Sequence, residues 1–289
     1  MSDIVITQLV NGLALGFIFV LVAVGLSIIF GMLGLVNFAH GAFFALSAYF
    51  GLTLYKYLGW AGVALAPVLV GIVGMVVERL LLRRAYGKEP LFGLILTFAL
   101  ALLIEALIRM TWGSASQPFT PPEFLQGVVE YGPIFLTKYR LSVVIVTIVL
   151  LAVLWAFLHR TPYGRILRAG SRDPEMIGLL GINIKRVFTG VFGLGTLFAG
   201  IAGILAAPLW SVTPNMSESA IMPAFVTVTI GGLGSYAGAV VAGLLVGVVM
   251  GLTVQFWPEA SAASMYVLMV AVLLLRPRGL FGERWERFE

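Results

Sequence analysis

The sequence contains no cysteine and few charged residues. Without cysteine it can form no disulfide, no thiolate metal site and no cysteine nucleophile. Only 11% of its 289 residues are charged, whereas a soluble domain carries about 25%. Because 60% of the residues are hydrophobic, the polar ones are too few to cover the surface of a soluble protein. The composition therefore predicts a membrane protein whose main solvent is lipid.

Motifs for catalysis and nucleotide binding are also missing. No phosphate-binding loop of the form G-x-x-x-x-G-K-[ST] occurs, and no serine stands in a G-x-S-x-G elbow. The stretch "TVTIGGLGSYAG" has the spacing of a dinucleotide loop, but no acidic residue follows it by about 20 positions and no βαβ unit surrounds it. We predict no catalytic residue, no metal site and no cofactor bound by this chain.

Most of the positive charge, 14 of the 18 lysines and arginines, lies in three short clusters beside long apolar runs. This is the pattern of cytoplasmic loops under the positive-inside rule, and it argues against a nucleic-acid partner. The clusters consist of Arg79, Arg83, Arg84 and Lys88; of Arg160, Arg165, Arg168, Arg172, Lys185 and Arg186; and of Arg276, Arg278, Arg284 and Arg287.

Long apolar runs fill most of the chain. About 20 apolar residues in a helix cross a hydrocarbon core about 30 Å thick. Runs of this kind extend over Val5 to Phe30, Leu35 to Tyr55, Ala61 to Leu81, Leu91 to Met110, Leu141 to His159, Val187 to Trp210, Ile221 to Val254 and Ala262 to Leu275. We predict an all-α polytopic membrane protein with one transmembrane domain over residues 1–289.

The basic clusters orient these spans. With the clusters inside, residues 112–139 and 211–220 lie outside, and the tail 276–289 is cytoplasmic. The run from Ile221 to Val254 is too long for one span, and "GGLGSYAG" interrupts it. We therefore expect eight or nine spans in the cytoplasmic membrane, with the N-terminus outside.

Glycine recurs at spacings that bring helices close together. Small residues four apart let helix backbones approach each other in lipid. Gly12 and Gly16 form one such pair, and Gly234 and Gly238 another. As packing or hinge positions in broken helices we select Gly231, Gly232, Gly234, Gly243, Gly247 and Gly251.

The connection at residues 159–186 carries a helix signal. Asp173 can cap a helix, Pro174 suits its first position and Gly181 suits a left-handed stop. The pattern predicts a two-turn cytoplasmic helix with Met176, Ile177 and Leu180 on one side. Arg168, Arg172 and Glu175 would remain available to solvent or a partner.

A few polar residues lie within the apolar runs. Glu105 and Arg109 are four apart on a helix, which predicts an ion pair near the outer boundary. Glu78, beside Arg79, is predicted to be solvated. His40 in "VNFAHGAFFALSAYF" has three alternatives: a structural histidine bonded to a backbone carbonyl, a pathway residue, or a metal ligand, for which no second ligand is visible.

Three stretches resemble the permease subunits of ABC importers for branched-chain, or hydrophobic, amino acids. They are "GLSIIFGMLGLVNFAHGAFFALSAYF", "VFTGVFGLGTLFAGIAGILAAP" and "AFVTVTIGGLGSYAGAVVAGLL", together with the loop before the second, and the likeness runs from about Gly12 to Gly279. "NFAHG" is similar to the LivH-type subunit. The consensus of ABC permeases, EAA followed by glycine, is only loosely matched by Arg168, Ala169 and Gly170.

The resemblance implies partners and roles. A LivM-type second permease, two ATP-binding subunits that carry ATP and Mg, and an extracytoplasmic substrate-binding protein would complete the importer. The loop at 159–186 would couple to the ATPases through Arg165, Arg168, Asp173, Pro174, Glu175, Met176, Leu180 and Gly181. A zwitterionic substrate needs some polar groups along its path, and the candidates are Asn37, His40, Thr227 and Thr229.

Two functions are open at this point. The first is a non-catalytic permease subunit of such an importer, driven by ATP hydrolysis in partner subunits. The second is a stand-alone secondary transporter or channel for small polar solutes, which would need coupling carboxylates of its own and ideally inverted repeats.

Overall fold

The computed structural model describes residues 2–131 and 134–282, and almost all of the regular structure is helical. A short hairpin, β1 (Val128–Tyr131) and β2 (Ile134–Thr137), is the exception. The long helices are α1 (Ser2–Leu33), α2 (His40–Leu58), α3 (Trp60–Leu80), α4 (Pro90–Trp112), α5 (Lys138–Arg160), α8 (Ile184–Trp210), α9 (Met216–Gly231), α10 (Tyr236–Phe256) and α11 (Ser261–Leu275). The shorter ones are α6 (Pro162–Arg172), α7 (Pro174–Leu179), η1 (Leu82–Arg84), η2 (Glu123–Leu125) and η3 (Pro258–Ala260).

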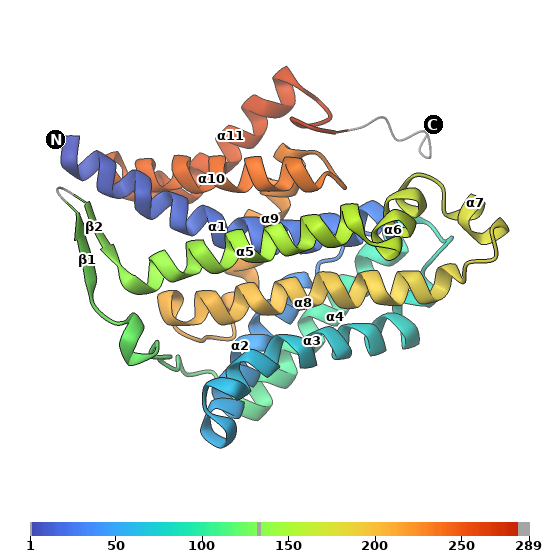
Figure 1. Cartoon of the computed structure of the whole chain (residues 1–289), viewed down its shortest axis with the longest axis horizontal. Helices are drawn as coiled ribbons and strands as arrows, with labels where there is room; N and C mark the ends of the chain where they lie inside the picture. Colours follow the sequence, from blue (N-terminus) through green and yellow to red (C-terminus); the bar gives the residue numbers. More distant parts are fainter. Residues whose placement is uncertain (1, 132–133, 283–289) are drawn as a thin grey trace.

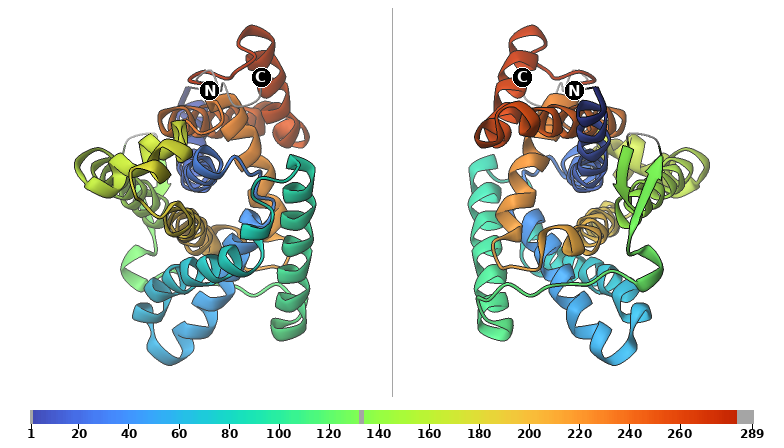
Figure 2. Two further views of the ribbon diagram at one scale, coloured as in Figure 1. Left: turned by 90° about the vertical axis from the view of Figure 1, so that its right-hand side faces the viewer. Right: turned by 90° about the vertical axis from the view of Figure 1, so that its left-hand side faces the viewer.

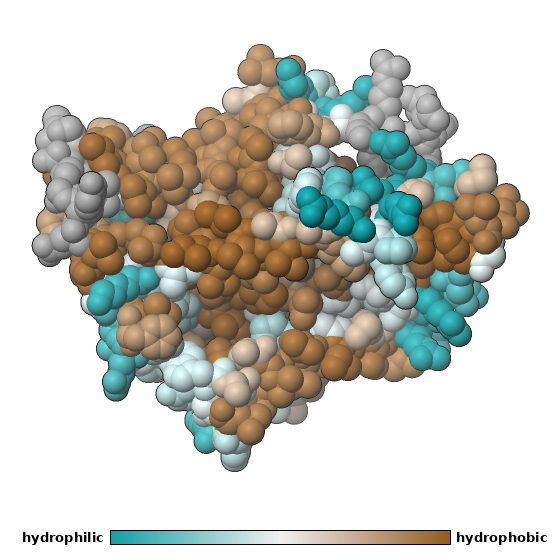
Figure 3. Space-filling view, in the orientation of Figure 1, coloured by the Kyte–Doolittle hydropathy of each residue, from teal (hydrophilic) through white to brown (hydrophobic). Residues whose placement is uncertain are grey.

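The chain is an all-α polytopic membrane protein, as predicted. Seven stretches of helix in the described part are long and apolar enough to cross a membrane. The helices α2, with 19 residues, and α9, with 16, belong to the same bundle but do not meet both the length and the hydropathy expected of a membrane span. The number of spans therefore stays a prediction. Apolar side chains cover the visible face across α5 and α10, where lipid would lie (Figure 3).

The two ends of the bundle differ in character. The start of α1 and the β1–β2 hairpin lie at one end of the long axis, and α6 and α7 lie at the other (Figure 1). This arrangement agrees with the predicted orientation, in which the basic loops are cytoplasmic and the N-terminus is outside. Arg284 and Arg287 of the third basic cluster, and the end of the tail from 283 on, lie outside the described residues.

Two breaks interrupt the long helices. The α1 helix ends where Gly34 adopts a positive φ of 63°, and residues 34–39 lead to α2 without helical structure. The α9 and α10 helices are separated at Gly232 and Gly234, with φ angles of 100° and 82° that favour glycine. The predicted interruption of the run from Ile221 to Val254 is therefore confirmed.

The α1 and α10 helices pack most extensively, through glycine on both sides. A Cβ added at Gly12 would lie 2.6 Å from the carbonyl oxygen of Gly247, and one added at Gly16 would lie 2.9 Å from that of Gly243. Such distances leave no room for a side chain, so backbone meets backbone along this seam. Gly251 meets Gly12 in the same way.

Two elements were not predicted from the sequence. The hairpin pairs Val128 with Thr137 in the outer segment 112–139, and a bridge between Gln117 and Val212 ties that segment to residues 211–220. The other element is α6, which begins at the capping residue Thr161, whose hydroxyl accepts from the Gly164 amide at 3.0 Å. Neither has the long apolar run that indicated the membrane helices.

We predict that Gly247→Leu lowers the stability of the folded chain by about 1–3 kcal/mol, because the added side chain would overlap the backbone of Gly12 and Gly16. Unfolding in detergent followed by circular dichroism measures this change. Gly190→Leu is the matched control, since nothing lies within 4 Å of a Cβ at that helical glycine. Equal stability of the two variants would contradict the close packing of α1 and α10.

Candidate functional site

The connection at residues 159–186 folds as two short helices, α6 and α7, between the ends of α5 and α8. Asp173 caps α7 by accepting a hydrogen bond from the Met176 amide at 2.9 Å, and Pro174 occupies the first turn. Gly181 has a φ of 80°, as the left-handed stop requires. The local signals of the sequence therefore produce the predicted helix, at the end of the bundle opposite the N-terminus (Figure 1).

The apolar residues of α7 do not share one side, which corrects the prediction. Ile177 is 3% exposed, whereas Met176 is 54% and Leu180 72% exposed. Leu180 lies one helical turn after Met176, to whose carbonyl its amide donates at 3.2 Å, whereas Ile177 is turned about 100° from Met176 and lies against Gly170. Leu179, which the sequence analysis did not select, is 84% exposed. The outer surface of α7 is thus apolar and open to a partner (Figure 3).

Gly170 seats this loop on the bundle. A Cβ at Gly170 would run into the methyl group of Met32 on α1 and would lie 3.1 Å from Ile177 Cδ1. This buried glycine is the last of the three residues that loosely match the ABC permease consensus. Arg165, Arg168 and Glu175 are exposed on the same loop. Their roles in coupling stay predictions.

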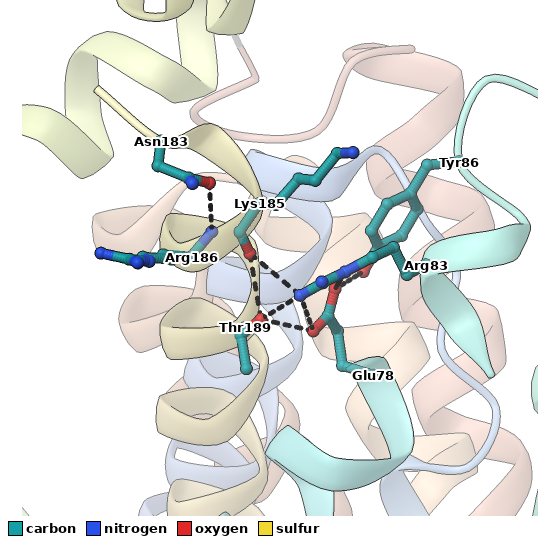
Figure 4. Close-up of polar contacts among 7 residues, drawn as sticks. All are labelled: Glu78, Arg83, Tyr86, Asn183, Lys185, Arg186 and Thr189. Atoms are coloured by element: carbon teal, nitrogen blue, oxygen red, sulfur yellow. Dashed lines mark hydrogen bonds and ion pairs between the residues drawn. The ribbon is translucent and has the colours of Figure 1, made fainter. Parts of the chain in front are cut away.

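A buried carboxylate lies at the base of the loop, where the sequence analysis predicted a solvated one. Glu78 on α3 is 0% exposed (Figure 4). Its Oε2 accepts from the Thr189 hydroxyl at 2.6 Å and lies 3.3 Å from Nη2 of Arg83, and its Oε1 accepts from the Tyr86 hydroxyl at 3.1 Å. The prediction of a solvated Glu78 is wrong because η1 folds Arg83 and Tyr86 back over the end of α3.

The cluster of Glu78, Arg83, Tyr86 and Thr189 joins three parts of the chain. Arg83 Nη2 also donates to the Thr189 hydroxyl at 2.7 Å and to the Lys185 carbonyl at 3.4 Å, both on the first turns of α8. Burial raises the pKa of the Tyr86 hydroxyl, and the Glu78 carboxylate raises it further. The start of α8 directly after the coupling loop is therefore held to α3 by charged hydrogen bonds.

The predicted pathway residues lie inside the bundle. Asn37, His40 and Thr227 are completely buried. His40 Nε2 is 3.0 Å from the Val22 carbonyl oxygen on α1, the contact expected of a structural histidine. Both polar side-chain atoms of Asn37 and the hydroxyl of Thr227 have no hydrogen-bond partner among the described residues.

Thr229 does not lie on the same side of α9 as Thr227. Residues two apart on a helix point about 200° apart, and Thr229 is partly exposed where Thr227 is buried. The two threonines therefore do not face one common path. Thr97 on α4, which the sequence analysis did not select, contacts the break instead. Its hydroxyl accepts from the Phe38 amide at 3.3 Å and lies 3.1 Å from the Val36 carbonyl.

The ion pair predicted near the outer boundary is confirmed. Arg109 Nη2 lies 2.7 Å from Glu105 Oε1 and donates at 2.7 Å to the side-chain oxygen of Asn215, just before α9. Glu105 also accepts from the Ser217 hydroxyl at 3.4 Å. The pair therefore ties α4 to α9 at the outer end.

The glycine break between α9 and α10 lies at the opposite end. There the amides of Leu280 and Phe281 donate to the carbonyls of Ile230 and Gly231 at 2.8 and 3.0 Å, which satisfies the end of α9. Gly232 has no room for a side chain, since an added Cβ would meet the backbone of Gly282, and Gly31 of α1 lies close to Gly234, since a Cβ added at Gly31 would lie 3.3 Å from the Cα of Gly234.

Comparison with known families supplies the context for this arrangement. Residues 8–275 match the profile of a family described as "Branched-chain amino acid transport system / permease component". The chain belongs to this family. The permease is accordingly a multi-pass protein of the inner membrane, in line with its seven long apolar helices.

Individual relatives agree with this membership. The permease is 30% identical to the Escherichia coli high-affinity branched-chain amino acid transport system permease protein LivH, over 95% of this chain and 94% of the relative. It is 28% identical to BraD of Pseudomonas aeruginosa, which has the same description, over 95% of both chains. Escherichia coli LivM is 27% identical over 91% of this chain and 67% of its own length.

We predict that Glu78→Gln destabilises the permease by roughly 1–3 kcal/mol, because Arg83 loses its carboxylate and one hydrogen bond is lost in a buried site. Unfolding in detergent measures the loss. Glu89→Gln, at an exposed position in the same connection, is the control. A Glu78→Gln variant as stable as the control would show that the cluster contributes nothing to the fold.

His40→Ala is expected to act on assembly rather than on conduction. The variant removes a buried ring and its contact with Val22, which should cost about 2–4 kcal/mol. The measurement compares the amount of folded protein with the transport rate per assembled complex, with His159→Ala, at an exposed position, as the control. Normal assembly with lost transport would instead assign His40 to the pathway.

Proposed function

We propose that this chain is the LivH-type permease subunit of an ABC importer and forms part of the transmembrane pathway for branched-chain or related hydrophobic amino acids. The observation that carries the proposal is the α6–α7 unit. It is a capped helix pair on the cytoplasmic side whose tip exposes Leu179 and Leu180. An exposed apolar tip of this kind suits a protein partner rather than water.

The energy for transport would come from other subunits. The chain has no phosphate-binding loop, and its family consists of transport permease components. We infer a non-catalytic subunit that binds no cofactor itself, with ATP and Mg held by two ATP-binding partners. The similarity to LivM supports a second, related permease as the other half of the transmembrane part.

The proposed coupling runs through contacts of the loop with the bundle. A partner that moves α7 would displace Ile177, which packs against Gly170. Gly170 in turn contacts Met32 at the end of α1, so the movement would reach α1. On the other side, the Asn183 side chain caps α8, and the Glu78 cluster joins α8 to α3. Motion of the loop would therefore shift α1, α3 and α8 together, as access alternates between the two sides.

Substrate selection would rest largely on an extracytoplasmic binding protein. Its docking surface would be formed by the outer segments 112–139 and 211–220, which the bridge between Gln117 and Val212 holds together. The two carboxylates in the membrane helices argue against stand-alone proton coupling, because buried Glu78 is bound by Arg83 and partly exposed Glu105 pairs with Arg109.

The test is reconstitution in liposomes of this chain with a second permease, two ATP-binding subunits and a binding protein of a branched-chain amino acid importer from the same organism. Leucine uptake should require ATP and all subunits. The variant Asp173→Lys/Glu175→Lys should lower uptake per ATP hydrolysed several-fold, because it reverses charge on α7. Asp173→Asn/Glu175→Gln is the matched control, since asparagine still caps the helix.

Two results would overturn the proposal. Leucine movement by this chain alone, without ATP, would make it a stand-alone transporter or channel. Unchanged uptake per ATP in the lysine variant would remove α7 from the coupling path.

A further inference from the structure

A large cavity opens at the cytoplasmic end of the bundle, apart from the tip of α7. Its volume is about 1100 Å³. The walls come from the ends of α1 and α5, from α6, and from the turn between α9 and α10. Hydrophilic side chains gather around the ends of α5 and α6 in this part of the molecule (Figure 3). The left view of Figure 2, which faces the same end, shows α5 and α6 beside α1.

The charged side chains that line the cavity, among the described residues, are all basic. Arg165, Arg168 and Arg172 of α6 line it together with His159, and no Asp or Glu is among its described lining residues. The guanidinium groups of Arg165 and Arg168 form no ion pair and no hydrogen bond within the described part of the chain. Uncompensated cations around a concave surface attract an anion, because the low-dielectric walls concentrate their field.

The deeper part of the cavity is apolar. Ile28 and Met32 of α1 and Leu158 of α5 contribute to it, and Leu158 and Met32 are buried. Ser27 also lines the cavity, and its hydroxyl is buried with no hydrogen-bond partner among the described residues. The site therefore combines cations and a free hydroxyl with a hydrocarbon surface.

The residues around the cavity are of the kinds found at the depth of the lipid headgroups. Trp155, another lining residue, is in the last turns of α5 and its ring stacks on that of His159 at 4.9 Å between centroids. Tryptophan near the end of a membrane helix is typical of the membrane–water interface. Arginines at this depth on the cytoplasmic side lie beside a leaflet that contains anionic lipids.

We propose that this cavity binds an anionic glycerophospholipid, with the phosphate between Arg165 and Arg168 and an acyl chain along Ile28, Met32 and Leu158. A transported amino acid fits less well, because its ammonium group would find no carboxylate in the lining. Free phosphate and a lipid phosphate present the same anionic group to the arginines, and only the lipid has an acyl chain that can contact the apolar residues. The proposal is independent of the solute that the permease carries.

Native mass spectrometry of the purified full-length chain tests the site. Phosphatidylglycerol should remain bound, while phosphatidylcholine with the same chains should not, and inorganic phosphate should fail to displace the bound lipid. Arg165→Ala/Arg168→Ala should weaken phosphatidylglycerol binding by about tenfold or more, as expected for the loss of two arginines near an anionic lipid. Arg84→Ala/Arg186→Ala removes the same charge from exposed positions outside the cavity and should leave binding unchanged.

Three results would overturn the proposal. The first is equal retention of phosphatidylglycerol and phosphatidylcholine, and the second is an equal loss of phosphatidylglycerol binding in both double variants. The third is displacement of phosphatidylglycerol by inorganic phosphate, which would indicate a site for small anions. If the Arg165→Ala/Arg168→Ala variant does not fold, a photoactivatable phosphatidylglycerol can be applied to the unaltered chain. Labelling between Trp155 and Arg172 is expected, and labelling only elsewhere would also refute the site.

Discussion

In lipid, every backbone amide and carbonyl that a helix leaves open must find a partner inside the protein. The breaks at residues 34–39 and at Gly232 to Ser235 meet this requirement with groups distant in the sequence. The Thr97 hydroxyl reaches the backbone of Val36 and Phe38, and the amides of Leu280 and Phe281 reach the end of α9. Broken helices in this permease therefore depend on α4 and on the C-terminal segment, and the fold around them must hold both in place.

Close approach of helix backbones is the second constraint, and it has the same origin, which is the lipid solvent. Lipid offers helices no hydrophobic drive to associate, so contact must come from packing and from polar contacts. The glycine seam of α1 and α10 supplies packing, and the Glu78 cluster supplies charged hydrogen bonds between α3 and α8. The loop of α6 and α7 meets the end of α1 where Gly170 contacts Met32, and it leads into α8, which the Glu78 cluster holds to α3 through Thr189.

Sequence patterns predicted the elements whose cause is local. The cap at Asp173, the stop at Gly181 and the pair of Glu105 with Arg109 each depend on residues a few positions apart, and each has the expected geometry. The same reasoning failed for Glu78, because its partners Tyr86 and Thr189 come from a folded-back turn and from a helix more than a hundred residues later. It also grouped Thr227 with Thr229, although the helix turns them apart.

By itself the sequence determined the class of the protein: the scarcity of charge and the long apolar runs specify a polytopic membrane protein, and the motifs that resemble ABC importer permeases indicated the family. Only the tertiary structure decided that His40 contacts Val22, that Glu78 is buried, and that Arg165 and Arg168 share a cavity with Ile28 and Ser27. The physical reason is the distance along the chain over which each effect acts. Hydropathy and capping act within one or two turns of a chain, whereas hydrogen-bond satisfaction, burial and the field of grouped charges depend on which helices become neighbours.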